Sequence, residues 1–341
     1  SGIFTATEAA VVAVIYSLII GLFVTKELRM KDLILALNCV APLCLVMCAG
    51  ALIRCSRVFP EELFDQLSTL CFRFLIPCLL FCNIYSADLS KAASPALMAF
   101  LIGELLIWFL LNYILFTRLE RNPRRRGVCI QAAYRSNIAV IGVTLARSMM
   151  GQNGVAAVTM AVAILVPTYN ILAVITLETC RGGPISLGET LRGVLRNPLV
   201  ISCALGVLAL LFGIRIPEQI LGSLEDLGSA GGTLTLVALG ASLRLHGLRQ
   251  QAGHLLRLSL YRLILAPLAA LAAARLLGFR GDSLATVLVC TAAPMASSSF
   301  PMALVYDSDH ELTGQLIVTT ALFCPFTLFL WILLLRMVGL I

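Results

Sequence analysis

The chain has 341 residues, of which 60% are hydrophobic and 13% charged, with a formal net charge of +7. Its mean hydropathy of +0.97 excludes an ordinary soluble domain and indicates an integral membrane protein. Most of the positive charge is arginine in short loops, which indicates membrane orientation and lipid headgroups as partners and argues against nucleic acid.

Residues 2–33 begin with a helix-capping pattern, Thr5 or Thr7 before Glu8, and continue as an apolar helix from Ala9 to Thr25. The string GIFTATEA at 2–9 resembles the signature of the large membrane subunit of TRAP dicarboxylate transporters, and the resemblance ends near Leu33. A TRAP site needs two re-entrant hairpins and their sodium ligands, which this segment lacks. We therefore expect residues 1–33 to be an extra N-terminal helix, a TRAP-like fragment of a longer or fused chain, whose topology stays open.

Ten apolar segments follow, each close to the length of about 20 residues that crosses the hydrocarbon core. They are expected near 33–53, 66–87, 95–117, 127–147, 153–177, 197–214, 221–243, 257–277, 283–306 and 312–335. The polar stretch 178–196 separates the fifth from the sixth, so we expect a first five-helix repeat at 34–178, a cytoplasmic linker at 179–196 and a second repeat at 197–341. The arginines at 118–126 are the densest positive cluster and predict that this end is cytoplasmic.

The two halves resemble each other. A shift of about 160 residues lays RSNIAVIGV of the fourth segment over PMASSSFP of the ninth, and Pro167 of the fifth near Pro325 of the tenth. Since five is odd, the halves must insert with opposite orientation. Inverted repeats with interrupted helices at matching positions are typical of secondary transporters.

The ninth segment contains two prolines, Pro294 and Pro301, around the serines 297–299. A lipid-facing helix does not tolerate the unbonded backbone groups that prolines create, unless protein or a water-filled cavity satisfies them. The segment therefore predicts either a broken crossover helix at a binding site or a kinked helix whose serines bond to their own backbone.

From about Leu33 to Ile341 the chain resembles the auxin efflux carrier (AEC) family, and its prokaryotic branch more than the plant carriers. The strings that carry the resemblance are FRFLIPCLLFCNIY at 72–85, YRSNIAVIGVTLARSMMGQNG at 134–154, VPTYNILAVI at 166–175, RNPLVI at 196–201, LVALGASL at 236–243 and APMASSSFPMALVYDSDHELTGQLIVTT at 293–320. The resemblance implies an all-α fold of ten transmembrane helices in two inverted five-helix repeats, with a scaffold part, a transport part, and helices 4 and 9 unwound where they cross. It also implies carriage of small organic anions (carboxylates, dicarboxylates or amino acids) by elevator-like alternating access.

Two departures from the family pattern matter. Where many members have Gly-x-Pro in the fourth helix, this chain has Gly142, Val143 and Thr144, so we expect its break to rest on Gly142 and Asn137. The long cytoplasmic loop of the plant carriers is missing, and with it any argument for hormone transport.

Two unwound crossings would bring helix N-termini and free amides to one point, which suits a carboxylate. Asn137 is the leading candidate, either bonding the ligand or locking the crossover through main-chain groups. Arg135 would bind a carboxylate bidentately, or else extend to the headgroups. The expected substrate-binding residues are Arg135, Ser136, Asn137, Gly142, Pro294, Ser297, Ser298, Ser299 and Pro301.

Other polar residues within the spans allow two interpretations. Glu104 is a candidate for proton coupling, or the partner of a neighbouring arginine. Arg73 has the same alternatives as Arg135. Asn83 and Asn170 are expected to form helix–helix hydrogen bonds, with cavity lining as the alternative. Glu225 and Asp226 are expected at the membrane interface.

No pattern indicates a cofactor or a metal site: the twelve cysteines lie mostly inside apolar spans, and the three histidines have no paired spacing. A hydrolase would need a base near the serines, whereas His310 falls in a loop. The sequence thus predicts a multi-pass transporter of the cell inner (plasma) membrane, not an enzyme, with proton or sodium coupling and a homodimer as open questions. The alternative is a transporter-like sensor that binds a carboxylate without moving it.

Overall fold

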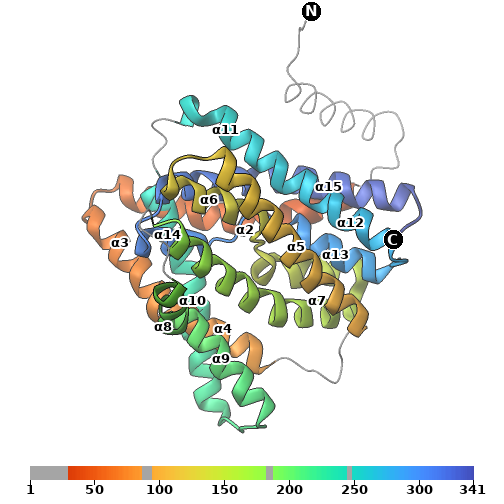
Figure 1. Ribbon diagram of the computed structural model, residues 1–341, viewed down its shortest axis with the longest axis horizontal. Coiled ribbons are helices and arrows are strands. Elements are labelled where there is room, and N and C mark those ends of the chain that lie inside the picture. The colour runs from red at the N-terminus through yellow and green to blue at the C-terminus, as the bar shows by residue number, and fades with distance from the viewer. Residues whose placement is uncertain (1–29, 87–93, 182–186, 244–247) are drawn as a thin grey trace, which may run out of the picture.

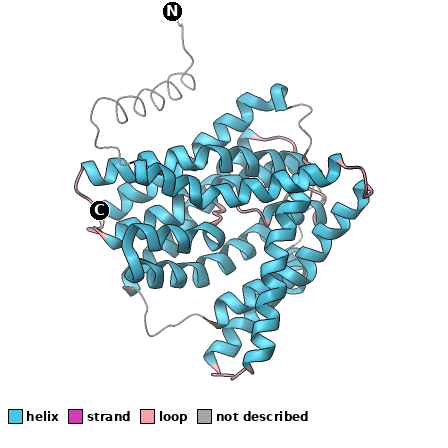
Figure 2. Ribbon diagram, turned by 180° about the vertical axis from the view of Figure 1, so that it is seen from behind, coloured by secondary structure: helices cyan, strands magenta, loops and turns pink. Residues whose placement is uncertain are grey.

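The computed structural model describes residues 30–86, 94–181, 187–243 and 248–341. Throughout these ranges the regular structure is helical, apart from one isolated β-bridge (Figures 1 and 2). This confirms the all-α class. The expected N-terminal helix lies outside the described residues.

The helices follow the apolar segments closely. Several of them begin where the sequence has an asparagine cap followed by a proline, the residues preferred at helix starts. Asn122 and Asn197 cap the helices that begin with Pro123 and Pro198, and Asp309 caps the last one. The first half contains α2 (Met30–Cys55), α3 (Glu61–Leu70), α4 (Ile76–Tyr85), α5 (Pro95–Leu119), α6 (Pro123–Tyr134) and α7 (Ile138–Thr179). The second half contains α8 (Leu187–Arg196), α9 (Pro198–Leu211), α10 (Glu218–Ser242), α11 (Leu248–Leu260), α12 (Ala266–Leu276), α13 (Asp282–Ala292), α14 (Ser299–Val305) and α15 (His310–Met337).

Two pairs of these helices are continuous through a π-helical turn. Cys71–Leu75 joins α3 to α4, and Tyr261–Leu265 joins α11 to α12. Each turn carries an arginine inside an otherwise apolar span, Arg73 and Arg262. π-Helical turns are frequent at functional sites because the extra residue re-aims a side chain.

In the described part of the chain, six helical stretches are long and apolar enough to cross a membrane: Ala36–Cys55, Glu61–Tyr85, Pro95–Leu119, Gly154–Thr179, Gln251–Leu276 and His310–Met337. Three shorter apolar helices accompany them, Ile138–Gly151, Pro198–Leu211 and Asp282–Ala292. The long helix α7 contains one non-helical residue, Gly151, with φ of 68°. Because glycine alone adopts this conformation without strain, Gly151 divides α7 where the sequence separates its fourth and fifth segments. The molecule is a multi-pass membrane protein.

Helix α10 packs against both α2 and α4, and α4 packs against α9 (Figure 1). Glycines make this close approach feasible: an added Cβ on Gly228 would meet the backbone of Leu79 in α4, and one on Gly240 would meet the Met47 carbonyl in α2. Small residues at helix contacts are the usual means of tight packing in membranes. The larger apolar core extends from α2 and α10 through α5, α6, α7, α11, α12, α13 and α15.

Candidate functional site

Two unwound segments cross in the interior and bond to each other. Residues 135–137 separate α6 from α7, and residues 293–298 separate α13 from α14. Ser136 and Met295 form an antiparallel bridge: the Asn137 N–H donates to the Pro294 carbonyl at 2.9 Å, and the Ala296 N–H donates to the Arg135 carbonyl at 3.3 Å. Each segment thereby satisfies backbone groups that the other has freed.

Side chains from neighbouring helices satisfy further groups at the crossing. Arg262 donates to the carbonyls of Ala133 (3.5 Å) and Ala293 (3.1 Å), which lie at the ends of α6 and α13. The Trp108 indole also donates to Ala133, and the Thr320 hydroxyl accepts from the Met295 N–H, both at 3.1 Å. Since unsatisfied backbone groups are costly away from water, these contacts explain how the open backbone persists.

Arg135 is buried at the crossing, with 2% of its surface exposed. Its guanidinium donates to Asn170 Oδ1 (2.6 Å), Ser298 Oγ (2.9 Å), Gln131 Oε1 (3.0 Å) and Ser299 Oγ (3.3 Å), and contacts Met302 Sδ. All these partners are neutral, and over the described ranges no carboxylate bonds to Arg135. The alternative in which Arg135 extends to the lipid headgroups is wrong, because the side chain points into the protein. Asn170 forms the helix–helix hydrogen bond that its sequence context predicts.

Ser136 and Asn137 are also buried, at 3% and 6% exposure, yet neither side chain has a hydrogen-bond partner among the described residues. The Asn137 amide does not cap α7; the contact that fixes the crossing comes from its main-chain N–H. Buried polar groups normally have partners. These two side chains therefore offer donors and acceptors to a ligand.

The helix break differs in one respect from the expectation. Gly142 lies inside α7, so the prediction that it forms the break is wrong; residues 135–137 unwind instead. Gly142 provides room, since an added Cβ would lie 3.2 Å from a methyl of Val158. In the ninth segment Pro294 is in the unwound stretch and Pro301 is in the first turn of α14.

The remaining candidates are spread more widely. Glu104 is half-buried in α5 and close enough to Arg262 for their charges to interact, which brings it near the crossing. Asn83 is half-buried in α4, away from these contacts. Glu225 and Asp226 are exposed on α10, and their position at the membrane interface stays a prediction. The His310 ring packs against Phe300, and within the described residues no serine at 297–299 bonds to a histidine.

A cavity of about 490 Å³ opens at the end of α14, and three arginines and one glutamate give it a positive balance. Tyr306 forms part of its wall, at the end of α14, one turn beyond the Met302 that contacts Arg135. Arg73, which the sequence offered as a second anion-binding residue, is exposed here. The lining residues are Phe72, Arg73, Phe74, Glu178, Arg181, Gly193, Arg196, Asn197, Pro198, Val305 and Tyr306.

Arg262 is the residue at this site that the sequence analysis missed. The sequence does contain the pattern that could have identified Arg262. It is a charged residue in the apolar run YRLILAP, the same context that singled out Glu104 and Arg73. Only the fold shows that its guanidinium bonds both broken helices at once.

Comparison with known proteins identifies the family. The family model described as "Membrane transport protein" matches residues 35–182 and 185–332. A second model, the DctM component of tripartite ATP-independent periplasmic transporters, matches residues 1–56, further than the resemblance to Leu33 suggested.

Two archaeal proteins are among the relatives of the chain. An uncharacterized transporter of Methanothermobacter thermautotrophicus is 26% identical over 293 residues, which cover 83% of this chain and 92% of the relative. Another, of Methanocaldococcus jannaschii, is 26% identical over 211 residues, 60% of this chain and 67% of the relative. The chain therefore belongs to the membrane transport protein family, that of the auxin efflux carriers.

Proposed function

We propose that the protein is a secondary transporter of small organic anions that binds a carboxylate at the crossing of residues 135–137 and 293–298. The observation that carries the proposal is Arg135, a buried guanidinium whose bonded partners among the described residues are all neutral. A buried cation without a counter-charge costs several kcal/mol. An anionic substrate would offset this cost and accept a bidentate pair of hydrogen bonds.

The neighbouring groups suit the same ligand. The unpaired Ser136 hydroxyl and Asn137 amide can donate to carboxylate oxygens, and α7 begins directly after Asn137 with its positive dipole end. Ser298 is partly exposed and holds Arg135 through a neutral bond that a carboxylate can replace. The positive cavity beside Tyr306 provides an attractive approach for an anion from the arginine-rich end.

The proposal includes the finer architecture. Ten crossings form two inverted five-helix halves, and an elevator-like movement shifts the crossing past a scaffold of α2, α4, α9 and α10. The π-helical turns, the two broken helices and the two consecutive family matches support this arrangement. Location in the inner (plasma) membrane, a homodimer and coupling to protons through Glu104 or to sodium belong to the same proposal.

Uptake of labelled carboxylates, dicarboxylates and amino acids into proteoliposomes tests this function. We expect flux of at least one of these anions in the native protein and its loss in Arg135→Gln. Arg275→Gln removes the same charge from an exposed position on α12 and should retain native flux. Binding without flux would indicate a sensor and contradict transport. Native flux in Arg135→Gln would show that Arg135 does not bind the substrate and would contradict the proposed site.

A pH gradient across the same vesicles tests the role of Glu104. Coupling predicts that the gradient accelerates uptake in the native protein but not in Glu104→Gln. Flux that is indifferent to the gradient would contradict proton coupling and leave the anion site standing.

A further inference from the structure

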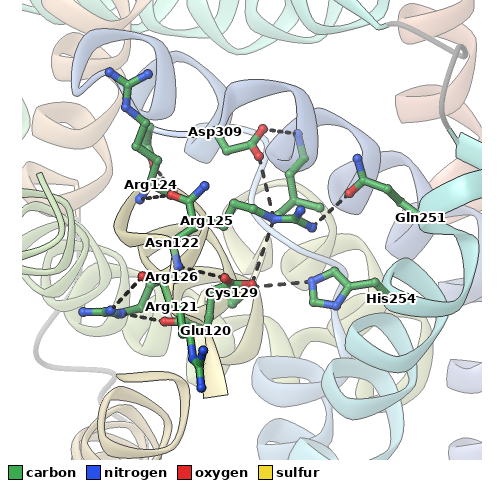
Figure 3. Close-up of polar contacts among 12 residues, drawn as sticks. Glu120, Arg121, Asn122, Arg124, Arg125, Arg126, Cys129, Gln251, His254 and Asp309 are labelled. Atoms are coloured by element: carbon green, nitrogen blue, oxygen red, sulfur yellow. Dashed lines mark hydrogen bonds and ion pairs between the residues drawn. The ribbon is translucent and has the colours of Figure 1, made fainter. Parts of the chain in front are cut away.

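Three side chains with different metal-binding chemistry meet at the arginine-rich end of the molecule, away from the crossing (Figure 3). Glu120 directly follows α5, Cys129 lies in the second turn of α6, and His254 lies in the second turn of α11. One donor atom from each lies within 4.8 Å of the other two, and Cys129 Sγ is 3.8 Å from His254 Nε2. No other group of three such residues is brought together in the described ranges.

We propose that Glu120, Cys129 and His254 form a site for Zn²⁺. Thiolate, imidazole and carboxylate are the ligands that zinc takes in proteins, with bonds of about 2.3 Å to sulfur and about 2.0–2.2 Å to nitrogen and oxygen. A tetrahedral ion with those bonds holds sulfur and nitrogen roughly 3.5 Å apart. The observed 3.8 Å needs only a small adjustment, and a fourth position stays open for water.

The charges around the site can accommodate a divalent cation. The Arg125 guanidinium lies between several partners: its Nε is 4.0 Å from the Glu120 carboxylate and 4.0 Å from the Asp309 carboxylate (Figure 3). Its Nη2 donates to Gln251 Oε1 at 3.0 Å. The guanidinium therefore retains two partners when Glu120 turns to a metal. On binding, the Cys129 thiol releases its proton to solvent, so thiolate and carboxylate together balance the two positive charges of zinc.

The surroundings also provide orientation and access. Glu120 Oε1 accepts from the Asn122 N–H at 3.0 Å, a second contact of the kind that orients ligating carboxylates. Cys129 is fully buried, whereas Glu120 and His254 are half-buried, so an ion has an open side from which to enter. Zinc would link α5, α6 and α11, three elements that are far apart along the chain, and stabilise the end of α6 opposite the crossing.

Titration of the purified full chain with ZnCl₂ and CoCl₂ tests the proposal. We expect Zn²⁺ to raise the thermal unfolding midpoint, because only the folded state brings the three ligands together, and Co²⁺ to produce the charge-transfer absorption of a thiolate ligand. Cys129→Ser should abolish the absorption band and weaken binding by more than about 100-fold, since the loss of an outer contact alone costs about 10- to 100-fold. His254→Gln should weaken binding similarly.

The matched control is Cys180→Ser, which removes another buried cysteine at the same end of the molecule. This variant should keep both the cobalt band and the zinc-induced stabilisation. If Cys129→Ser does not fold, Glu120→Gln and His254→Gln change half-buried positions and decide the question. Absence of metal binding in the native chain, a cobalt band that survives in Cys129→Ser, or native zinc affinity in Glu120→Gln and His254→Gln would overturn the site.

Discussion

The Asn137 side chain is buried at the crossing without a hydrogen bond to the described protein, while its main-chain N–H bonds Pro294. The two roles that the sequence left open are therefore separable. Asn137→Ala keeps the main-chain contact and removes only the amide. We expect this variant to fold with an unchanged thermal midpoint and to bind the substrate about 10- to 100-fold more weakly, the value of one or two hydrogen bonds to a charged ligand.

The measurement is the thermal midpoint of purified protein in detergent, with and without a transported anion. Ser148→Ala is the control, because this exposed hydroxyl of α7 bonds only to the carbonyl four residues back and should change neither quantity. A midpoint several degrees lower without ligand would show that the amide locks the fold, and would assign Asn137 a structural role.

Single residues were the part of the site that the sequence predicted best. Arg135, Ser136 and the serines 297–299 stand out because polar groups in apolar segments need a reason to be there. What the sequence could not give was their partners. That Arg135 bonds Asn170 and that Arg262 spans both broken helices depends on contacts between residues 31 to 129 positions apart.

The same limit explains the proposed metal site. Cys129 and His254 are 125 positions apart, so no ligand spacing of the kind that marks zinc motifs exists in the sequence. Three helices create the cluster only after folding.

Among the elements, α10 depends on glycine for its contacts. Gly240 lies so close to the Met47 carbonyl of α2 that an added Cβ cannot be accommodated without moving a backbone, whereas Gly232, on the same helix, has no atom within 4 Å of that position. Gly240→Ala should therefore destabilise the protein by about 1–3 kcal/mol through overpacking. Gly232→Ala is the matched control and should leave stability unchanged or slightly raised.

Thermal midpoints of the two variants, measured side by side, check this prediction. Equal midpoints would mean that α2 and α10 separate easily, and would count against a rigid scaffold that includes both helices.

The elements themselves were largely predictable, because apolar length and proline or glycine positions set where helices start and stop. The wrong prediction at Gly142 shows the limit of predicting helix breaks from glycine positions. A glycine in a membrane helix serves either to unwind the chain or to admit a neighbour, and at Gly142 the neighbour is Val158. Here the break follows from the bonds of residues 135–137 to the ninth segment, which no local pattern encodes.

At the scale of the whole molecule, alternating access requires the crossing to move relative to α4 and α9. Phe72, in the π-helical turn before α4, packs edge-to-face against Tyr306 at the end of α14, with ring centroids 6.4 Å apart. Both residues line the positive cavity, although only 2% of Phe72 and 8% of Tyr306 is exposed; replacing the two rings by cysteine opens this contact to a reagent that enters the cavity. We expect a bifunctional maleimide to stop transport when both are replaced by cysteine, because the link would join the proposed scaffold to the proposed moving part.

The control pair is Phe100 and Phe279, whose rings lie 5.4 Å apart and join α5 to the loop between α12 and α13, within the proposed moving part. Linking these positions should leave flux intact, since their separation does not change in an elevator movement. The exposed Cys48 and Cys55 and the half-buried Cys44 and Cys78 are first replaced by serine, which leaves only buried native cysteines beside the introduced pairs. Full transport with Phe72→Cys and Tyr306→Cys linked would exclude relative movement at this contact, because a fixed bridge and an elevator shift cannot coexist there.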